Sequence, residues 1–236
     1  MENRNVCVIN SNPKKSVKTD GFYLCLKKMI ESIQTAWQNL HWSETWAVIF
    51  GVLYVVLAAR ESVWCWFWGI LSCSLWAWAA YKIYDLYIDA LLQLFYVGVS
   101  FAGIWQWLRG GESKKELRIS SLKIREHFLW IGLGLGLTFP TGYFFDNYTQ
   151  AAATYPDAFT TIFSVIATFM VVQKKLENWL YWLAINATYV WLYSSRGSWL
   201  FTALFILYFF IAIFGYREWK KIMRMEANKN LDRPFP

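Results

Sequence analysis

The stretch Leu176-Glu-Asn-Trp-Leu-Tyr-Trp-Leu-Ala-Ile-Asn-Ala-Thr-Tyr-Val-Trp-Leu-Tyr-Ser194 combines an apolar run of membrane length with a stripe of aromatic and amide side chains. Trp182, Asn186 and Tyr189 stand at i, i+4 and i+7, so a helix places them on one face. The Asn186 amide needs several hydrogen-bond partners, which lipid cannot supply. The stretch therefore predicts a membrane-spanning helix whose polar face looks into the protein, where Asn186 binds a ligand or, alternatively, a neighbouring helix.

The composition of the whole chain also points to a protein that lies in the lipid bilayer. Its 236 residues are 57% hydrophobic, 20% aromatic and 17% charged. Soluble domains are about 45–50% apolar and about 25% charged, and a globule of this size cannot bury such an apolar excess. These values exclude a soluble enzyme of ordinary surface, a disordered chain and a disulfide scaffold. The net charge of +7 lies mostly between apolar runs, so we expect contact with lipid headgroups and no nucleic-acid partner.

Seven apolar runs are long enough to cross a hydrocarbon core of about 30 Å. We predict an all-α integral membrane protein with spans at Glu44–Ala59, Val63–Ile83, Leu86–Leu108, His127–Phe145, Pro156–Gln173, Leu176–Ser194 and Trp199–Trp219. An earlier segment, Gly21–Leu40, is interrupted by Lys27 and Lys28. It is typical of an amphipathic helix lying in the membrane interface, with an eighth span as the alternative.

The distribution of Lys and Arg predicts the orientation. With the C-terminus in the cytoplasm, 15 of these residues lie on the inner side and 8 on the outer side. Because basic residues accumulate in cytoplasmic loops, we predict an outer N-terminus and an inner C-terminus. The predicted organisation is an N-terminal tail with the interfacial helix (1–43), a first three-helix bundle (44–108), a basic cytoplasmic loop with a linker helix and an outer loop (109–155), a second three-helix bundle (156–219) and a cytoplasmic tail (220–236).

Two pairs of short motifs indicate an internal repeat. Glu61-Ser-Val-Trp-Cys-Trp66 and Glu177-Asn-Trp-Leu-Tyr-Trp182 both read Glu-x4-Trp at an offset of 116 residues. Gly103-Ile-Trp-Gln-Trp107 and Gly215-Tyr-Arg-Glu-Trp219 match at an offset of 112. Three helices, one linker helix and three more helices would place the two halves in parallel about an axis along the membrane normal. The alternative is that Trp marks interfaces in both places, and we expect Trp105, Trp107 and Trp219 to lie there.

Further polar side chains inside the spans are candidate ligand contacts, because such groups are costly in lipid. Asp89 and Gln93 stand at i and i+4, with Gln93 deeper and Asp89 near an entrance or at a solvated helix start. Ser164 lies on a polar line in the fifth span, where it can also bond to its own helix. With Trp66 and Trp182 as walls, the site would suit a neutral or cationic aromatic nucleoside or vitamin better than a phosphate ester.

Motifs for other chemistries are missing from the sequence. His41 and His127 stand far apart, and the chain has no HExxH, P-loop or GxGxxG motif. We therefore expect neither an enzyme nor a bound metal or cofactor.

The residues resemble one known family. The run Leu86-Tyr-Ile-Asp-Ala-Leu-Leu-Gln-Leu-Phe95, followed by Gly103-Ile-Trp-Gln-Trp107, resembles the third span of the PnuC nicotinamide riboside transporters. The segment from Asp157 through Lys175-Leu-Glu-Asn-Trp-Leu-Tyr-Trp182 to Asn186 resembles the second-half signature of that family. The resemblance extends from about Glu44 to Lys221. It implies a SWEET-like 3+1+3 fold, an inner-membrane location, and uptake of a vitamin-type NAD precursor by facilitated diffusion. It also implies a cytoplasmic riboside kinase that traps the substrate by phosphorylation.

The predicted substrate site follows from the residues and the resemblance together. We expect alternating access around a midplane site, with nicotinamide riboside bound by seven side chains: Trp182, Asn186, Gln93, Trp66, Tyr189, Asp89 and Ser164. A carrier of thiamine or a sugar on the same fold is the alternative, and a membrane subunit that transports nothing is a further one. The sequence leaves open whether the chain forms a homo-oligomer.

Overall fold

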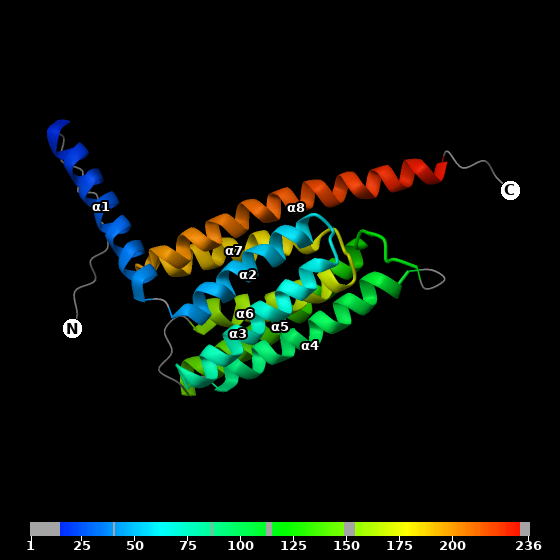
Figure 1. Ribbon diagram of the computed structural model, residues 1–236, viewed down its shortest axis with the longest axis horizontal. Coiled ribbons are helices and arrows are strands. Elements are labelled where there is room, and N and C mark those ends of the chain that lie inside the picture. Colours follow the sequence, from blue (N-terminus) through cyan, green and yellow to red (C-terminus); the bar gives the residue numbers. More distant parts are fainter. Residues whose placement is uncertain (1–14, 40, 86, 112–114, 149–153, 232–236) are drawn as a thin grey trace.

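The computed structural model describes residues 15–39, 41–85, 87–111, 115–148 and 154–231 (Figure 1). All regular elements in these ranges are helices, so the prediction of an all-α protein is confirmed for them. The helices are α1 (Lys15–Asn39), α2 (Trp42–Ala59), α3 (Trp64–Lys82), α4 (Tyr87–Arg109), α5 (Ile124–Tyr148), α6 (Thr154–Val172), α7 (Asn178–Ser195) and α8 (Trp199–Leu231).

Five of the described helices contain a stretch that is long and apolar enough to cross a membrane. The stretches are Trp42–Ala59, Asp89–Arg109, Ile124–Tyr148, Thr154–Val172 and Trp199–Asn228. The predicted spans in α3 and α7 form helices of 19 and 18 residues, but Trp, Tyr, Ser and Asn side chains lower their hydropathy. At these two places the predicted helices are present, but their hydropathy is lower than that of the other five.

Helix α1 projects away from the bundle and contacts α8 (Figure 1). It contains the predicted amphipathic segment except for Leu40, which lies outside the described residues, as does Leu86 at the start of the third predicted span. Tyr23, Ile30 and Trp37 are exposed on this helix. At the other end of the chain, α8 continues past the predicted end of the last span at Trp219 to Leu231.

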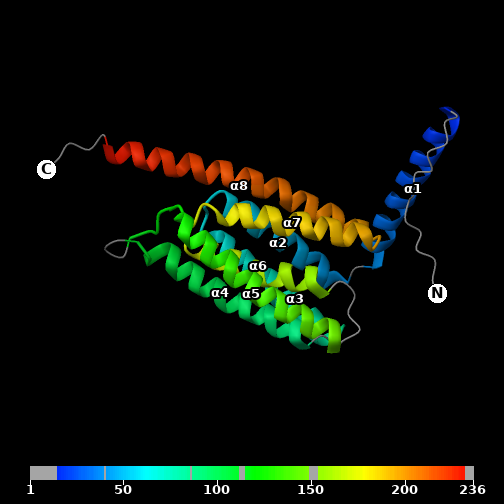
Figure 2. The ribbon, with the colours of Figure 1, turned by 180° about the vertical axis from the view of Figure 1, so that it is seen from behind.

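The other helices pack as two similar sets with α5 beside them. In the first helix set, α3 contacts α2 and α4, and in the second helix set, α7 contacts α6 and α8. Helix α5 packs on α6. Two contacts join the sets, α2 with α8 and α4 with α6 (Figures 1 and 2). Exchanging α2 with α6 and α4 with α8 turns one of these contacts into the other, so the sets are joined in a reciprocal way.

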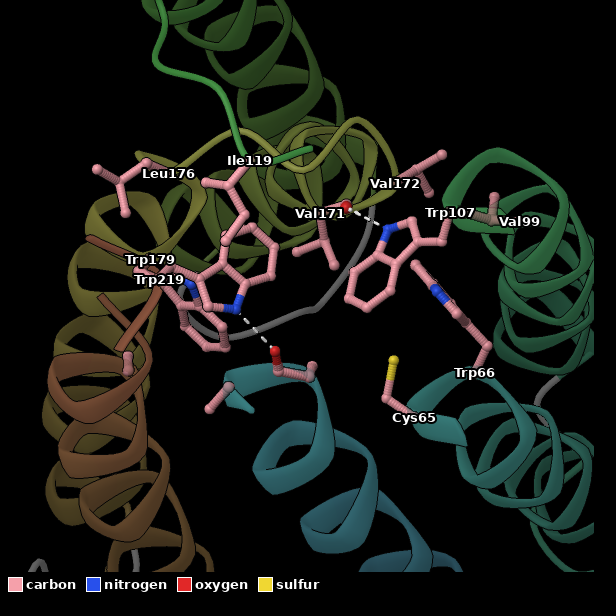
Figure 3. Close-up of a cluster of buried hydrophobic side chains, with 13 residues drawn as sticks. Cys65, Trp66, Val99, Trp107, Ile119, Val171, Val172, Leu176, Trp179 and Trp219 are labelled. Carbon is pink, nitrogen blue, oxygen red and sulfur yellow. Dashed lines mark hydrogen bonds between the residues drawn. The ribbon is translucent and has the colours of Figure 1, made fainter. Parts of the chain in front are cut away.

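Two buried tryptophans connect the sets at the same end of the bundle. The Trp107 indole on α4 donates to the carbonyl of Val171 at 3.0 Å, and the Trp219 indole on α8 donates to that of Ala58 at 2.9 Å (Figure 3). Both acceptors lie in the last turn of a helix, and each also accepts the backbone N–H of the residue three positions on, Glu61 for Ala58 and Lys174 for Val171. Both tryptophans are fully buried. The two indoles therefore do not face lipid headgroups, as expected of interface markers, because the protein encloses them and their N–H groups bond to helix ends.

Each of these tryptophans packs against a second tryptophan, which in turn lies over a glycine. In the first helix set, Trp66 covers Gly103 and meets Trp107 edge-on, with ring centroids 5.5 Å apart and an interplanar angle of 83°. The second helix set repeats the arrangement with a centroid distance of 5.5 Å and an angle of 89°, through Trp179, Gly215 and Trp219.

This geometry corrects the register of the repeat. Trp179, which follows Trp66 by 113 residues, occupies the equivalent position, so the pairing of Trp66 with Trp182 at an offset of 116 is wrong. Trp179 and Trp182 of α7 are three residues apart, nearly one helical turn. The motif Glu-x4-Trp therefore matched the wrong member of that pair, whereas the 112-residue offset of Trp107 and Trp219 is confirmed.

An ion pair lies where the ends of α2 and α6 meet. Glu61 and Lys174, also 113 residues apart, follow these helices with φ angles of 58° and 48°. Such left-handed residues terminate helices. The Lys174 Nζ lies 2.7 Å from the Glu61 Oε1 and 4.6 Å from the ring centroid of Trp107. Their side chains are only 5% and 17% exposed, so the two charges compensate each other in a largely buried place.

We expect Gly103→Ala to destabilise the protein. The added Cβ would lie 2.5 Å from ring atoms of Trp66, so the indole must move. Overpacking of this kind costs about 1–3 kcal/mol. Gly98 on the same helix has no atom within 4 Å of such a Cβ, so Gly98→Ala is the matched control. Thermal unfolding in detergent should give a lower Tm for Gly103→Ala alone; equal values for the two variants would contradict this packing.

We also expect Lys174→Met to lower the free energy of unfolding by about 3–5 kcal/mol, because it leaves the Glu61 carboxylate without its partner. The double variant Lys174→Met/Glu61→Gln should recover part of the loss. The exposed pair of Lys221 and Glu218, at 3.9 Å, is the control, and Lys221→Met should cost no more than about 1 kcal/mol. Chemical unfolding of the four proteins measures the difference; a loss in Lys174→Met as small as in Lys221→Met would refute the role of the buried pair.

Candidate functional site

Two adjoining cavities lie between the two helix sets. The smaller has a volume of about 150 Å³ and the larger about 350 Å³. Tyr54, Trp182, Phe205 and Tyr208 line both of them, so the cavities form one branched space. The described lining residues come from the three helices of each set and include none from α1 or α5. Binding sites for small molecules commonly measure about 300–1,000 Å³, so this space can hold a small vitamin.

The structure brings together six of the seven predicted site residues. Trp182 lines both cavities, Asn186 lines the smaller, and the larger is lined by Gln93, Trp66, Ser164 and Tyr189. Asp89 is the exception. It is exposed in the first turn of α4 and lines neither cavity.

Two amides in this space have no partner in the described part of the chain. Asn186 is 4% exposed, yet its side chain makes no hydrogen bond to a described residue, and the same holds for Gln93. Buried polar groups are nearly always hydrogen-bonded, and the exceptions point to a bound water or ligand. The amides therefore offer donors and acceptors to a molecule in the cavity.

Aromatic rings form the side of the cavity that belongs to the second helix set. Tyr189 on α7 stacks on Phe205 of α8 with ring centroids 4.3 Å apart and an interplanar angle of 23°. Tyr193 stacks on the same Phe205 at 5.3 Å and 8°. Because Trp182 lies between the two cavities, a flat ring entering either one meets an indole face or edge. Such a wall favours aromatic and cationic rings.

The described residues that line the two cavities carry no formal charge. The polar groups are amides, hydroxyls and one thiol. A bound phosphate would lose its hydration without gaining a cationic partner, which costs several kcal/mol. The site is therefore suited to uncharged or singly cationic ligands.

Sequence reasoning did not place Tyr54, Cys73, Phe205 or Tyr208 in the site, although all four line it. A signal for two of them exists in the repeat. Tyr208 follows Tyr96, and Phe205 follows Gln93, by 112 residues, which is the spacing of Trp107 and Trp219. Extending the repeat along α4 and α8 would have found them.

A cavity lined by six helices, without formal charge among its described lining residues, in a helical protein with several membrane-length apolar stretches, is typical of a membrane protein that binds a small molecule. Comparison with known proteins gives the family. The sequence profile of the nicotinamide mononucleotide transporters matches residues 41–221, and the chain belongs to this family, which includes the PnuC transporters. The resemblance inferred from the sequence is thereby confirmed.

Several relatives cover most of the chain. The nicotinamide riboside transporter PnuC of Escherichia coli is 27% identical over 218 residues, which are 82% of this chain and 91% of the relative. PnuC of Neisseria mucosa is 22% identical, over 89% and 84%. The riboflavin/roseoflavin transporter RibM of Streptomyces davaonensis is 24% identical, over 83% and 92%. A crystal structure of the vitamin B3 transporter PnuC has a similar fold, with a TM-score of 0.63, 22% identity, and coverage of 85% and 90%.

Proposed function

We propose that this protein takes up nicotinamide riboside through the branched cavity between its two helix sets. The observation that carries the proposal is the buried amide of Asn186 beside Trp182. This amide has no hydrogen-bond partner among the described residues, and the described residues that line the cavity carry no formal charge. Nicotinamide riboside has a flat cationic ring, a carboxamide and a neutral sugar, and these suit an indole, an amide and hydroxyl groups respectively. The names of the relatives in Escherichia coli and Neisseria mucosa support the same substrate.

The proposed membrane arrangement has seven spans, α2 to α8, as two parallel three-helix bundles joined by α5. The reciprocal contacts of α2 with α8 and of α4 with α6 support it. Although α3 and α7 are less apolar, helices of 19 and 18 residues reach about 27–29 Å, close to the thickness of the hydrocarbon core. The proposed location is the inner membrane. The distribution of Lys and Arg supports an orientation with the N-terminus outside and the C-terminus in the cytoplasm. Helix α1 then lies in the outer interface.

Transport would occur by alternating access, with the two helix sets moving relative to each other around the cavity. The uncharged lining supports facilitated diffusion, because proton or cation coupling commonly uses a carboxylate inside the membrane. Phosphorylation by a cytoplasmic riboside kinase would add negative charge, for which the cavity has no cationic partner. The product would then stay inside the cell.

Within the site, we assign the ring of the ligand to Trp182 and the hydrogen bonds to Asn186 and Gln93. Tyr189 and Ser164 would add secondary contacts in the larger cavity. Trp66, which is 1% exposed, would close that cavity at its edge. Asp89 would meet the ligand only on its way in, because it lies at the exposed start of α4.

Ligand-dependent thermal stabilisation of the purified protein tests the substrate. Nicotinamide riboside should raise the Tm, whereas nicotinamide mononucleotide at the same concentration should not, because its phosphate must be desolvated. Thiamine, riboflavin and simple sugars complete the panel. A larger shift with one of these would move the function to that ligand. Equal affinities for the riboside and its phosphate would contradict charge exclusion, and the absence of any shift would favour a subunit that transports nothing.

The role of Asn186 is tested separately. Asn186→Ala should weaken riboside binding by about 1–3 kcal/mol, a factor of about 5–150 in Kd, because the ligand loses a hydrogen bond in a buried place. Thr188→Ala on the same helix is the control, since the Thr188 hydroxyl donates to the carbonyl of Ala184 and does not line the cavities. Isothermal titration of both variants measures the change. An unchanged Kd in Asn186→Ala would assign the amide to helix packing.

A further inference from the structure

Helix α8 carries an exposed stripe of side chains that changes from apolar to cationic near the end of the bundle. The members of the stripe follow one another at steps of three and four, so they lie on one face of the helix. The stripe consists of Ala203, Leu207, Phe210, Phe214, Arg217, Lys221, Arg224 and Asn228. It is apolar as far as Phe214, which is 47% exposed, and cationic from Arg217 onward. The change therefore occurs within one helical turn.

Trp219 determines the depth at which this change occurs. Its buried indole donates to the carbonyl of Ala58, so it lies level with the last turn of α2, where a membrane-length apolar helix ends. Helix α8 continues past this level (Figure 1). From Trp219 to Arg224 the helix rises by about 7–8 Å, close to the depth of one headgroup layer outside the hydrocarbon core. In the proposed membrane arrangement the cationic part of the stripe therefore lies among lipid headgroups, and the apolar part lies among acyl chains.

The cations surround a hollow on the surface of α8. The hollow has a volume of about 370 Å³ and is lined by Arg217, Lys220, Lys221, Arg224, Met225 and Asn228. Among the described residues, a carboxylate lies within salt-bridge distance of one of these cations, Lys221, whose Nζ is 3.9 Å from the Glu218 Oε1. The Lys220 Nζ lies over the ring of Tyr216, 5.5 Å from its centroid. The hollow therefore concentrates positive charge that the described carboxylates neutralise only in part.

The acidic residue that follows in the helix lies on the other side of α8. Glu226 lines a different cavity, together with Glu61 and Lys174 at the end of the bundle. Arg217 and Lys221 stand at i and i+4 on the exposed face, where like charges destabilise a helix. An anion bound on that face would offset the repulsion.

We propose that this part of α8 is a binding site for the headgroup of an anionic phospholipid. The lipid phosphate lies among Arg217, Lys221 and Arg224, because guanidinium and ammonium groups form charge-assisted hydrogen bonds with phosphate. An acyl chain lies along Phe210 and Phe214, which continue the same stripe into the hydrocarbon core. A soluble phosphate would not use this apolar part, so the stripe as a whole fits a lipid. The inference depends on the proposed membrane arrangement and not on the transported substrate.

The affinity of the purified protein for two phospholipids tests the site. Native mass spectrometry in detergent, with added phosphatidylglycerol or phosphatidylcholine, measures each Kd. The unchanged protein should prefer phosphatidylglycerol, and Arg217→Gln/Lys221→Gln/Arg224→Gln should weaken its binding about a hundredfold, since each Lys or Arg near anionic headgroups contributes about fivefold. The control Arg118→Gln/Lys123→Gln/Arg125→Gln removes as many exposed cations from the segment around the start of α5 and should keep the affinity.

Each outcome of this titration decides the proposal. Equal affinities of the unchanged protein for the two lipids would overturn it. An equal loss in the two triple variants would also overturn it, because binding would then follow net charge and not this face of α8. Thermal unfolding in detergent without added lipid establishes that both variants are folded. The response of the Tm to riboside is measured separately, so failure of the lipid site leaves the proposed function standing.

A second measurement gives the position of the lipid and its source. Acetylation of lysines by a water-soluble reagent, measured on peptides by mass spectrometry, should slow about fivefold or more at Lys221 when phosphatidylglycerol is added. Lys123, which is exposed at the start of α5, is the control and should react at an unchanged rate. Glycerophosphoglycerol, the same headgroup without acyl chains, should not protect Lys221 at the same concentration. Equal protection by this soluble headgroup would assign the hollow to soluble phosphates, and no protection by the lipid would remove Lys221 from the site.

Discussion

A helix that ends inside an apolar protein leaves carbonyl groups that need donors. Here the turn that follows each helix supplies one donor, and the opposite half of the molecule supplies a second. The indoles of Trp107 and Trp219 bond to the last turns of α6 and α2 in the opposite set. Ala58 and Val171, which provide the acceptor carbonyls, also line the smaller cavity. Part of the lining of the smaller cavity is therefore formed by the same residues that join the two sets. Movement of one set relative to the other must change the shape of this cavity.

The same two-set construction explains how one family can accommodate different vitamins. Relatives named for nicotinamide riboside and for riboflavin are both similar in sequence to most of this chain. Because the cavity lies between two similar but unequal walls, substitutions in one wall can alter the space while the other retains its aromatic contacts. At the 113-residue offset of the repeat, the counterpart of Trp182 in this chain is Gly69, and both residues line the cavity. Specificity can thus change without disturbing the tryptophans that hold the sets together.

The sequence predicted most of the helices and six of the residues that line the candidate site, for a simple physical reason. Polar residues such as Asn186 and Gln93 stand out in apolar runs, because a bilayer tolerates them only when they face the protein interior. Tryptophan is ambiguous, since its apolar body and single N–H suit both an interface and a buried carbonyl. That ambiguity misplaced Trp107 and Trp219 and shifted the repeat by three residues at Trp182. Distant side chains such as Tyr54 gave no local signal, because their role depends on which helices meet.

The buried pair of Glu61 and Lys174 has a consequence for the symmetry of the molecule. The two residues occupy equivalent places in the two sets but carry opposite charges. Two copies of the first set joined in the same way would bring two carboxylates together in a largely buried place, and two copies of the second set would bring two ammonium groups together. Like charges so placed strongly disfavour association. The pair therefore requires two unlike halves, and two identical copies of either half could not be joined in this way without a change at this position.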